Sequence, residues 1–218
     1  MIHRFLLFGI VLLLCTSSTA VGQEVLDRPI SFEVGGSPGG GTFFVGGDDN
    51  TEVDYNVYTF SFYGDWYATQ KVAVEGEYTF GVGMGQDITF RNGLIPGQQV
   101  PWTNDIMGRV LFFPQGTTGP RFPFYIGGGV GMLTLLSRNQ TKKLGYDPEI
   151  TSSERFGVTS IGGGVKIPRG AGAPNWSFRA DYRFLFINSN DSAPQFFARD
   201  ERRTGHHVQF GLQYAFRR

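Results

Sequence analysis

Side chains near the end of the chain alternate between two kinds. From Val208 to Phe216, every second residue is large and apolar, and the residues between are polar or small. A β-strand sends successive side chains to opposite faces, so this period of two predicts a strand with one apolar face. A strand that crosses a membrane needs this pattern, with apolar side chains toward lipid and an aromatic at the interface.

Seven other segments have the composition or the alternation of β-strands. The eight predicted strands span residues 30–44, 53–63, 66–82, 105–113, 122–136, 155–167, 176–187 and 206–216. Residues 37–41 interrupt the first of them with a proline and three glycines. This sequence predicts a break or a bulge there, because proline and glycine weaken a regular strand.

The connections between these segments alternate in length. Residues 64–65, 114–120 and 168–175 form short connections, whereas 83–104, 137–154 and 188–204 are long and polar; 45–52 is a modest member of the long set. Short turns at one end and long loops at the other are the plan of an up-and-down transmembrane β-barrel. We therefore expect an eight-stranded antiparallel barrel with both termini at the short-turn, periplasmic end.

Aromatic residues gather beside the short connections. The predicted membrane girdle consists of Trp66, Tyr67, Phe113, Phe122 and Trp176. Such a ring is expected at one membrane interface. The alternative explanation is that aromatics are simply common at strand ends.

Charged residues occupy the opposite face of the same strands. They carry both signs and comprise Lys71, Glu75, Glu77, Arg109, Arg179, Asp181 and Arg183. If the aromatic face is outside, these charges lie in the lumen, where buried ions must be paired and hydrogen-bonded. An eight-stranded barrel is just wide enough for side chains to fill. We predict a plugged lumen network, with a proton or ion path as the alternative.

Alternation alone does not tell which face is inside. A soluble lipid-carrier barrel also has eight strands and would place its charges outside. The aromatic rim favours the membrane orientation, as does the absence of a packing helix after the last strand. Gly127, Gly129 and Gly131 share the face opposite the apolar one, which suits a crowded lumen better than a solvated surface.

The N-terminus predicts export. Arg4 precedes an apolar segment, residues 5–14, which is too short to span a bilayer as a helix. We expect a cleavable signal peptide over residues 1–20, with cleavage after Ala20 or, as the alternative, after Gly22, and one domain over residues 21–218. Cys15 is the only cysteine, so the mature chain has no disulfide. The 19 basic and 19 acidic residues balance, which implies no nucleic-acid partner.

The last strand resembles the small outer-membrane β-barrel domain family of Gram-negative bacteria, the group around the transmembrane domain of outer membrane protein A. Gln209, Gly211, Tyr214 and Phe216 match the polar-x-Gly-x-x-aromatic-x-aromatic signal that the barrel assembly machinery of that family recognises. The resemblance implies a monomer in contact with outer-membrane lipids and lipopolysaccharide, without metal, cofactor or catalytic residues. Its expected role is structural or interactive, through long loops at the cell surface.

A second resemblance concerns enzymes. Residues 181–190 are similar to the seventh-strand segment of the lipid A deacylase barrels, which carry a histidine and a serine two residues apart there. Ser189 has Ile187 in place of that histidine. His206 or His207 on the next strand could supply the base that a serine nucleophile needs. We expect a shared scaffold without the active site, and keep an ester hydrolase acting on lipid A as the alternative.

Overall fold

Ten β-strands make up the regular structure of the residues that can be described. The computed structural model describes residues 30–45, 54–90, 93–117, 122–138, 151–168, 175–188 and 202–217. The strands are β1 (Ile30–Val45), β2 (Tyr55–Tyr67), β3 (Val72–Gly83), β4 (Gly85–Phe90), β5 (Gly93–Gln99), β6 (Trp102–Phe112), β7 (Phe124–Arg138), β8 (Thr151–Pro168), β9 (Trp176–Asn188) and β10 (Arg202–Arg217). The predicted signal peptide lies outside the described residues. Among those residues, no helix is long and apolar enough to cross a membrane.

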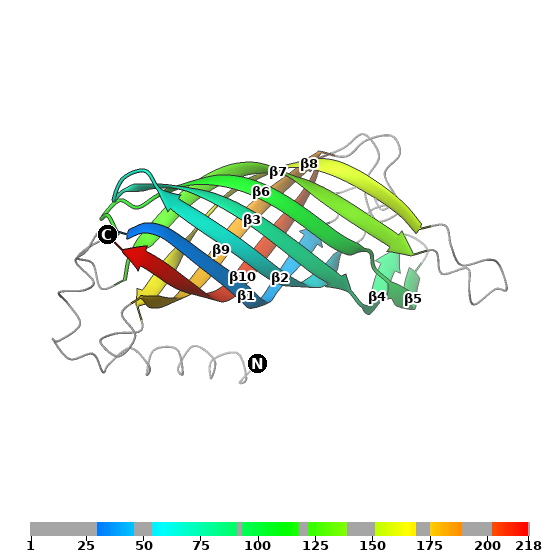
Figure 1. Ribbon diagram of the computed structural model, residues 1–218. Helices are drawn as coiled ribbons and strands as arrows, with labels where there is room; N and C mark the ends of the chain where they lie inside the picture. Colours follow the sequence, from blue (N-terminus) through cyan, green and yellow to red (C-terminus); the bar gives the residue numbers. More distant parts are fainter. Residues whose placement is uncertain are drawn as a thin grey trace.

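Eight of the strands form one closed barrel (Figure 1). The order around it is β1-β10-β9-β8-β7-β6-β3-β2, and neighbours are antiparallel. Pairing of β1 with β10 closes the sheet, with Phe32 opposite Phe216. The end of β10 lies at the same end of the barrel as the β2–β3 turn (Figure 1). The predicted eight-stranded antiparallel barrel is therefore confirmed.

The first short turn lies later in the chain than predicted. Residues 64–65 are not a turn, because β2 continues through them to Tyr67 and the chain reverses over residues 68–71. The hydroxyl of Thr69 accepts hydrogen bonds from the backbone N–H groups of Lys71 (3.1 Å) and Val72 (3.0 Å). A threonine hydroxyl that bonds nearby backbone in this way stabilises a turn. Asp65 and Trp66 consequently belong to β2.

A hairpin that the sequence did not predict occupies the connection at 83–104. β4 pairs with β5 to form a separate two-stranded sheet outside the barrel wall (Figure 1). The side chain of Gln86 holds the hairpin against β2. Its amide oxygen accepts a hydrogen bond from the backbone N–H of Asn56 (3.1 Å), and its amide nitrogen donates to the carbonyl of the same residue.

The predicted irregularity in the first strand is a β-bulge. The pairing register shifts between Gly36 and Gly39 toward β10, and between Ser37 and Gly41 toward β2. Side chains satisfy the displaced backbone groups. The Ser37 hydroxyl lies 2.7 Å from the carbonyl of Phe210, and the Tyr58 hydroxyl donates to the carbonyl of Pro38 (2.5 Å).

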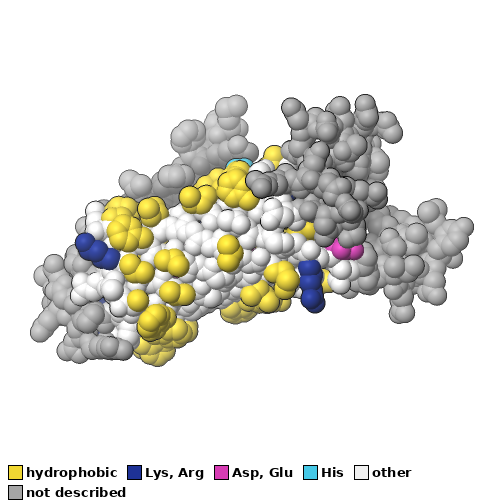
Figure 2. Space-filling model, turned by 90° about the horizontal axis from the view of Figure 1, so that it is seen from above, with side chains coloured by type: hydrophobic (Ala, Val, Ile, Leu, Met, Phe, Trp, Pro, Cys, Tyr) yellow, Lys and Arg dark blue, Asp and Glu magenta, His cyan; other side chains and the backbone are white. Residues whose placement is uncertain are grey.

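The outer face of the barrel is apolar. Phe62, Val130 and Ile161 are among its most exposed side chains, at 66%, 67% and 62%. Hydrophobic side chains are spread along the wall in Figure 2, and the charged side chains visible there lie toward the two ends. This orientation is the opposite of that expected for a soluble carrier barrel.

The predicted girdle divides between the two faces. Trp66, Phe122 and Trp176 are exposed on the outside. Tyr67 and Phe113 point into the barrel instead and are buried, which corrects their predicted placement. Each directly follows an outward aromatic in the sequence, Trp66 or Phe112, and neighbouring residues of an extended chain face opposite sides.

Candidate functional site

The lumen is filled in three layers. At the short-turn end lies an apolar and aromatic layer of Tyr67, Ala73, Leu111, Phe113 and Tyr125. A larger apolar layer lies toward the long-loop ends of the strands and contains Phe44, Tyr55, Val57, Val100, Met107, Leu133, Leu135, Phe156, Val158, Leu185 and Ile187. Nine buried charged side chains lie between them, whereas the buried Arg203 lies with the larger apolar layer, 5.5 Å from the ring centre of Tyr55. We call these charged side chains the lumen network: Glu33, Asp65, Glu75, Glu77, Arg109, Lys166, Arg179, Asp181 and Arg183.

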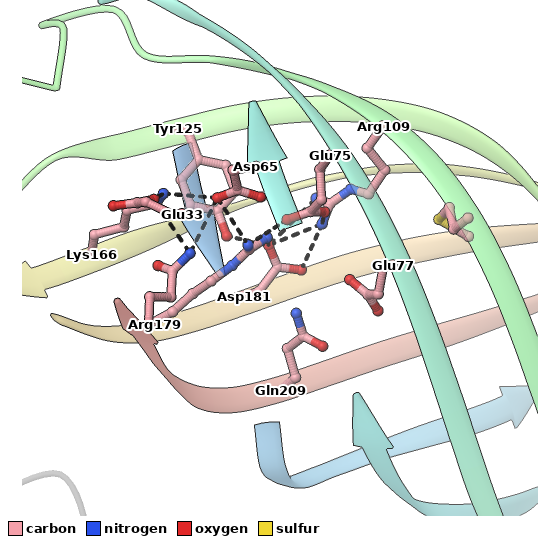
Figure 3. Close-up of polar contacts among 12 residues, drawn as sticks. Glu33, Asp65, Glu75, Glu77, Arg109, Tyr125, Lys166, Arg179, Asp181 and Gln209 are labelled. Atoms are coloured by element: carbon pink, nitrogen blue, oxygen red, sulfur yellow. Dashed lines mark hydrogen bonds and ion pairs between the residues drawn. The ribbon is translucent and has the colours of Figure 1, made fainter. Parts of the chain in front are cut away.

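Lys166 organises the part of the network nearest the short turns (Figure 3). Its ammonium group forms ion pairs with Glu33 and with Asp65, the latter at 3.0 Å, and donates to the hydroxyl of Tyr67. That hydroxyl in turn donates to Glu33 (2.5 Å). The side-chain amide of Gln213 donates to Asp65 at 3.1 Å. One cation therefore sits between two carboxylates that neutral donors also bind.

Two arginines and two carboxylates form the centre (Figure 3). Arg179 is ion-paired with Glu75 and, at 3.2 Å, with Asp181. Arg109 bridges the same two carboxylates at 2.9 and 3.3 Å. The hydroxyl of Tyr125 also donates to Asp181. Shared carboxylates of this kind are satisfied from several sides, which buried charges require.

Arg183 extends the network toward the long loops. It lies 2.6 Å from Glu77 and 2.9 Å from Asp181. The Thr79 hydroxyl donates to Glu77 (2.7 Å) and is itself 2.7 Å from the hydroxyl of Ser61. The three parts form one continuous chain of contacts, because Arg179 also lies 3.7 Å from Asp65.

Aromatic faces complete the environment of two cations. The Lys166 ammonium lies 5.2 Å from the ring centre of Tyr67 and 5.1 Å from that of Phe113. The Arg179 guanidinium lies 4.5 Å from the Tyr63 ring. A desolvated cation is attracted to the face of an aromatic ring at such distances. The inward rings of Tyr67 and Phe113 therefore help to stabilise the buried ammonium group of Lys166.

Inward glycines make room for the arginines. Gly129 is paired with Arg109, and a Cβ atom at Gly129 would collide with the Arg109 side chain and with the backbone of Gly108. Gly162 stands in the same relation to Arg183. The predicted role of the glycines of the fifth strand as small lumen residues is consistent with this packing.

Six of the seven predicted lumen residues lie in this network: Glu75, Glu77, Arg109, Arg179, Asp181 and Arg183. The seventh, Lys71, is exposed in the β2–β3 turn, because β3 begins only at Val72. Sequence reasoning missed Glu33, Asp65 and Lys166. Glu33 and Lys166 had the correct parity in predicted strands, whereas Asp65 was assigned to a turn.

The residues of the proposed assembly signal divide between the faces of β10. Gln209 and Gly211 face the lumen and are buried. Phe216 is exposed on the outside, and Tyr214 beside it is half-buried; their rings are 5.1 Å apart. Tyr214 also contacts Trp176 of β9 edge to face, at 5.3 Å between ring centres.

The two histidines of β10 have separate surroundings. His207 faces the lumen, where its Nδ1 lies 2.8 Å from the Thr42 hydroxyl. His206 faces outward and its Nδ1 lies 2.7 Å from the Tyr182 hydroxyl. Ser189, the predicted nucleophile of the hydrolase alternative, lies outside the described residues. Within the described ranges, no group of three or more His, Cys, Asp or Glu side chains could hold a metal ion.

Comparison with solved structures gives the fold a precedent. Neisserial surface protein A superposes with a TM-score of 0.60 at 11% identity, over 85% of this chain and 97% of that one. Outer membrane protein OprG of Pseudomonas aeruginosa gives 0.48 at 14% identity, over 88% and 98% of the two chains. No family model matches the sequence, and no curated protein does. The likeness to Neisserial surface protein A shows a shared barrel fold.

Proposed function

We propose that this chain is exported and inserted as a barrel into the outer membrane of a Gram-negative-type bacterium, where it has a non-enzymatic, structural or interactive role. The observation that carries the proposal is the inverted distribution of side chains. Charged residues fill the lumen, and large apolar residues cover the wall. An apolar surface of that extent is a site of contact with lipid or protein, since soluble monomers rarely expose one.

The dimensions of the barrel support insertion in a membrane. A tilted transmembrane strand needs about 9–11 residues. The barrel strands range from 11 residues in β6 to 18 in β8. Closure between β1 and β10 leaves no open sheet edge, and a hydrocarbon environment tolerates only closed barrels or helices.

The proposed orientation places both termini and the short turns in the periplasm. The long connections then face the outside of the cell, where they would contact partners. The wall would contact outer-membrane lipids and lipopolysaccharide, and the protein would be a monomer. Gln209, Gly211, Tyr214 and Phe216 would present the last strand to the barrel assembly machinery. The signal peptide expected over residues 1–20 supports this route.

The filled lumen supports a role other than diffusion through a pore. The lumen network is sealed between two apolar layers, and Arg109, Arg179 and Arg183 are among the largest fully buried side chains. A barrel of eight strands leaves room for little besides these side chains. We therefore assign function to the outer surfaces of the protein and not to its interior.

Cell fractionation tests the proposal. The protein should sediment with the outer membrane and should migrate differently on a gel before and after boiling, since membrane barrels resist unfolding by detergent. Recovery as a soluble periplasmic protein would contradict it. Mass spectrometry of lipid A from cells with and without the protein should show the same acyl pattern. Loss of an acyl chain on expression would favour the hydrolase alternative.

A further inference from the structure

The outer wall carries a polar pair with a hydrogen-bonding position that the described residues leave open. Tyr182 of β9 is 48% exposed, and His206 of β10 is half-buried beside it. Nδ1 of His206 is hydrogen-bonded to the Tyr182 hydroxyl at 2.7 Å. Among the residues that the structure describes, Nε2 of His206 makes no hydrogen bond.

Other tyrosines of the wall bind backbone or amide groups. Tyr58 donates to the carbonyl of Pro38, Tyr78 donates to the side chain of Asn104 (3.0 Å), and Tyr214 accepts from Asn175 (3.4 Å). An imidazole differs from these partners, because its second nitrogen can donate or accept a hydrogen bond.

His206 lies below the loop end of the wall. It pairs with Phe184, four residues before the end of β9 at Asn188. With a rise of about 3.3 Å per residue and a tilt of about 40°, this places the ring roughly 10 Å beneath the end of that strand. Ten residues of β10 separate His206 from the aromatic Phe216 at the short-turn end, and at the same tilt they rise about 25 Å, the height of the apolar band of a membrane barrel. In a membrane His206 would therefore lie at the outer edge of that band, where headgroups give way to acyl chains.

Aromatic side chains enclose the imidazole on both sides. Its ring centre is 5.1 Å from that of Phe184, and Phe43 of β1 is its partner on the other strand and is 47% exposed. Polar residues continue from His206 toward the loops: Thr204 lies two residues along β10, and the exposed Asn188 lies at the end of β9. The polar positions thus form a track from the loop end into the apolar wall.

We propose that the pair of His206 and Tyr182 binds a lipid whose acyl chain carries a hydroxyl group near the headgroup. The chain lies between the aromatic rings, the headgroup lies toward Asn188, and the hydroxyl bonds Nε2 of His206. This inference rests on the proposed function, since it requires the wall to face lipid. At the edge of the apolar band, a hydroxyl on the first carbons of an acyl chain lies level with His206, because it is only a few bonds from the headgroup.

The test uses the full-length mature protein in phosphatidylethanolamine nanodiscs. These contain equal small amounts of two synthetic phosphatidylethanolamines, one with 3-hydroxymyristoyl chains and one with myristoyl chains. Native mass spectrometry then counts the lipid molecules of each kind that stay bound to the protein when it is released from the nanodisc. The wild type should retain the hydroxylated lipid in about a five-fold excess, the effect of one net hydrogen bond. The imidazole ¹⁵N signal of His206 should shift only with that lipid.

Two variants locate the effect. His206→Phe keeps an aromatic ring beside Phe184 and removes both nitrogens. The ratio of bound hydroxylated lipid to bound plain lipid should therefore fall to about one. Tyr78→Phe removes a wall hydroxyl elsewhere and should leave the excess unchanged. Equal retention of both lipids by the wild type would overturn the inference, as would a persisting excess in His206→Phe.

The remaining outcomes separate this inference from the proposed function. If the wild type forms a dimer and His206→Phe is a monomer, the inference is overturned, and a second copy of the chain occupies the surface around His206. Wild-type protein that inserts and shows heat-modifiable mobility, yet has no lipid preference, contradicts the inference alone. Protein that does not insert into the bilayer contradicts both.

Discussion

Arg179 and Glu75 form a direct ion pair although their strands lie on opposite sides of the barrel. Four steps around the sheet separate β9 from β3 in either direction. Arg183 and Glu77 join the same two strands, and Lys166 and Asp65 join β8 to β2, which are also opposite. The network therefore braces the barrel across its diameter as well as around its wall.

Removing one brace should destabilise the barrel strongly. In Arg179→Met the carboxylates of Glu75 and Asp181 lose a buried partner, and we expect unfolding free energy to fall by about 3–5 kcal/mol. Urea titration of the folded fraction in lipid vesicles measures this. Lys71→Met is the matched control, because Lys71 is exposed in a turn; its effect should stay within about 0.5 kcal/mol. Equal effects would contradict the assignment of Arg179 to a buried network.

The inward glycines should not tolerate larger side chains. Gly129→Val collides with Arg109 and with the backbone of the next strand, so we expect a loss of about 2 kcal/mol or more. Gly76→Val is the matched control, since a Cβ atom at this outward position meets nothing within 4 Å. Vesicle-folded samples of both variants would be compared by urea unfolding. A Gly129→Val protein as stable as Gly76→Val would show that the lumen is less crowded there.

The bulge in β1 should depend on a hydroxyl group. Tyr58→Phe leaves the carbonyl of Pro38 without its donor on the apolar outer wall, at an expected cost of about 1–3 kcal/mol. Tyr78→Phe should cost less, because the flexible Asn104 side chain can reorient whereas a backbone carbonyl cannot. Urea unfolding of both variants in the same vesicles measures the two losses of unfolding free energy. Equal losses would contradict the special role of the Tyr58 hydroxyl at the bulge.

The lumen should not conduct ions steadily. Planar bilayers that contain the wild type should show no stable channel, and we expect the same of Glu75→Gln combined with Arg179→Gln. The apolar layers that contain Phe113 and Phe44 remain in place in that double variant and still exclude water. A stable channel in the double variant alone would mean that the charges, and not the apolar layers, seal the barrel.

The last strand should matter more for assembly in cells than for stability. Phe216→Ala should lower the amount of heat-modifiable protein in the outer membrane, if Phe216 is part of a recognition signal. Phe210→Ala removes a similarly exposed ring from the same strand and serves as the control. Both purified variants should refold equally well in vesicles. Equal membrane levels in cells would remove the proposed role of Phe216.

Alternation in the sequence was sufficient to predict the eight barrel strands and the facing of most of their side chains, but it did not predict β4 and β5. It placed Arg179, Asp181 and Arg183 on one face correctly because parity within a strand is a local property. It could not pair Arg179 with Glu75, since contacts across the lumen depend on the closure and tilt of the whole sheet. Local propensity misplaced one turn as well: Gly64 and Asp65 resemble turn residues, but the alternation of β2 continues through them.

The position of the lumen network between two apolar layers also fixes its response to ionic strength. Salt weakens ion pairs at a protein surface because counterions can gather around them. Counterions from either side of the barrel would have to pass Phe113 or Phe44 and their neighbours to reach Arg179. The ion pairs across the lumen should therefore be equally strong in dilute and in concentrated salt. The fold should then keep its stability when the salt concentration around the cell changes.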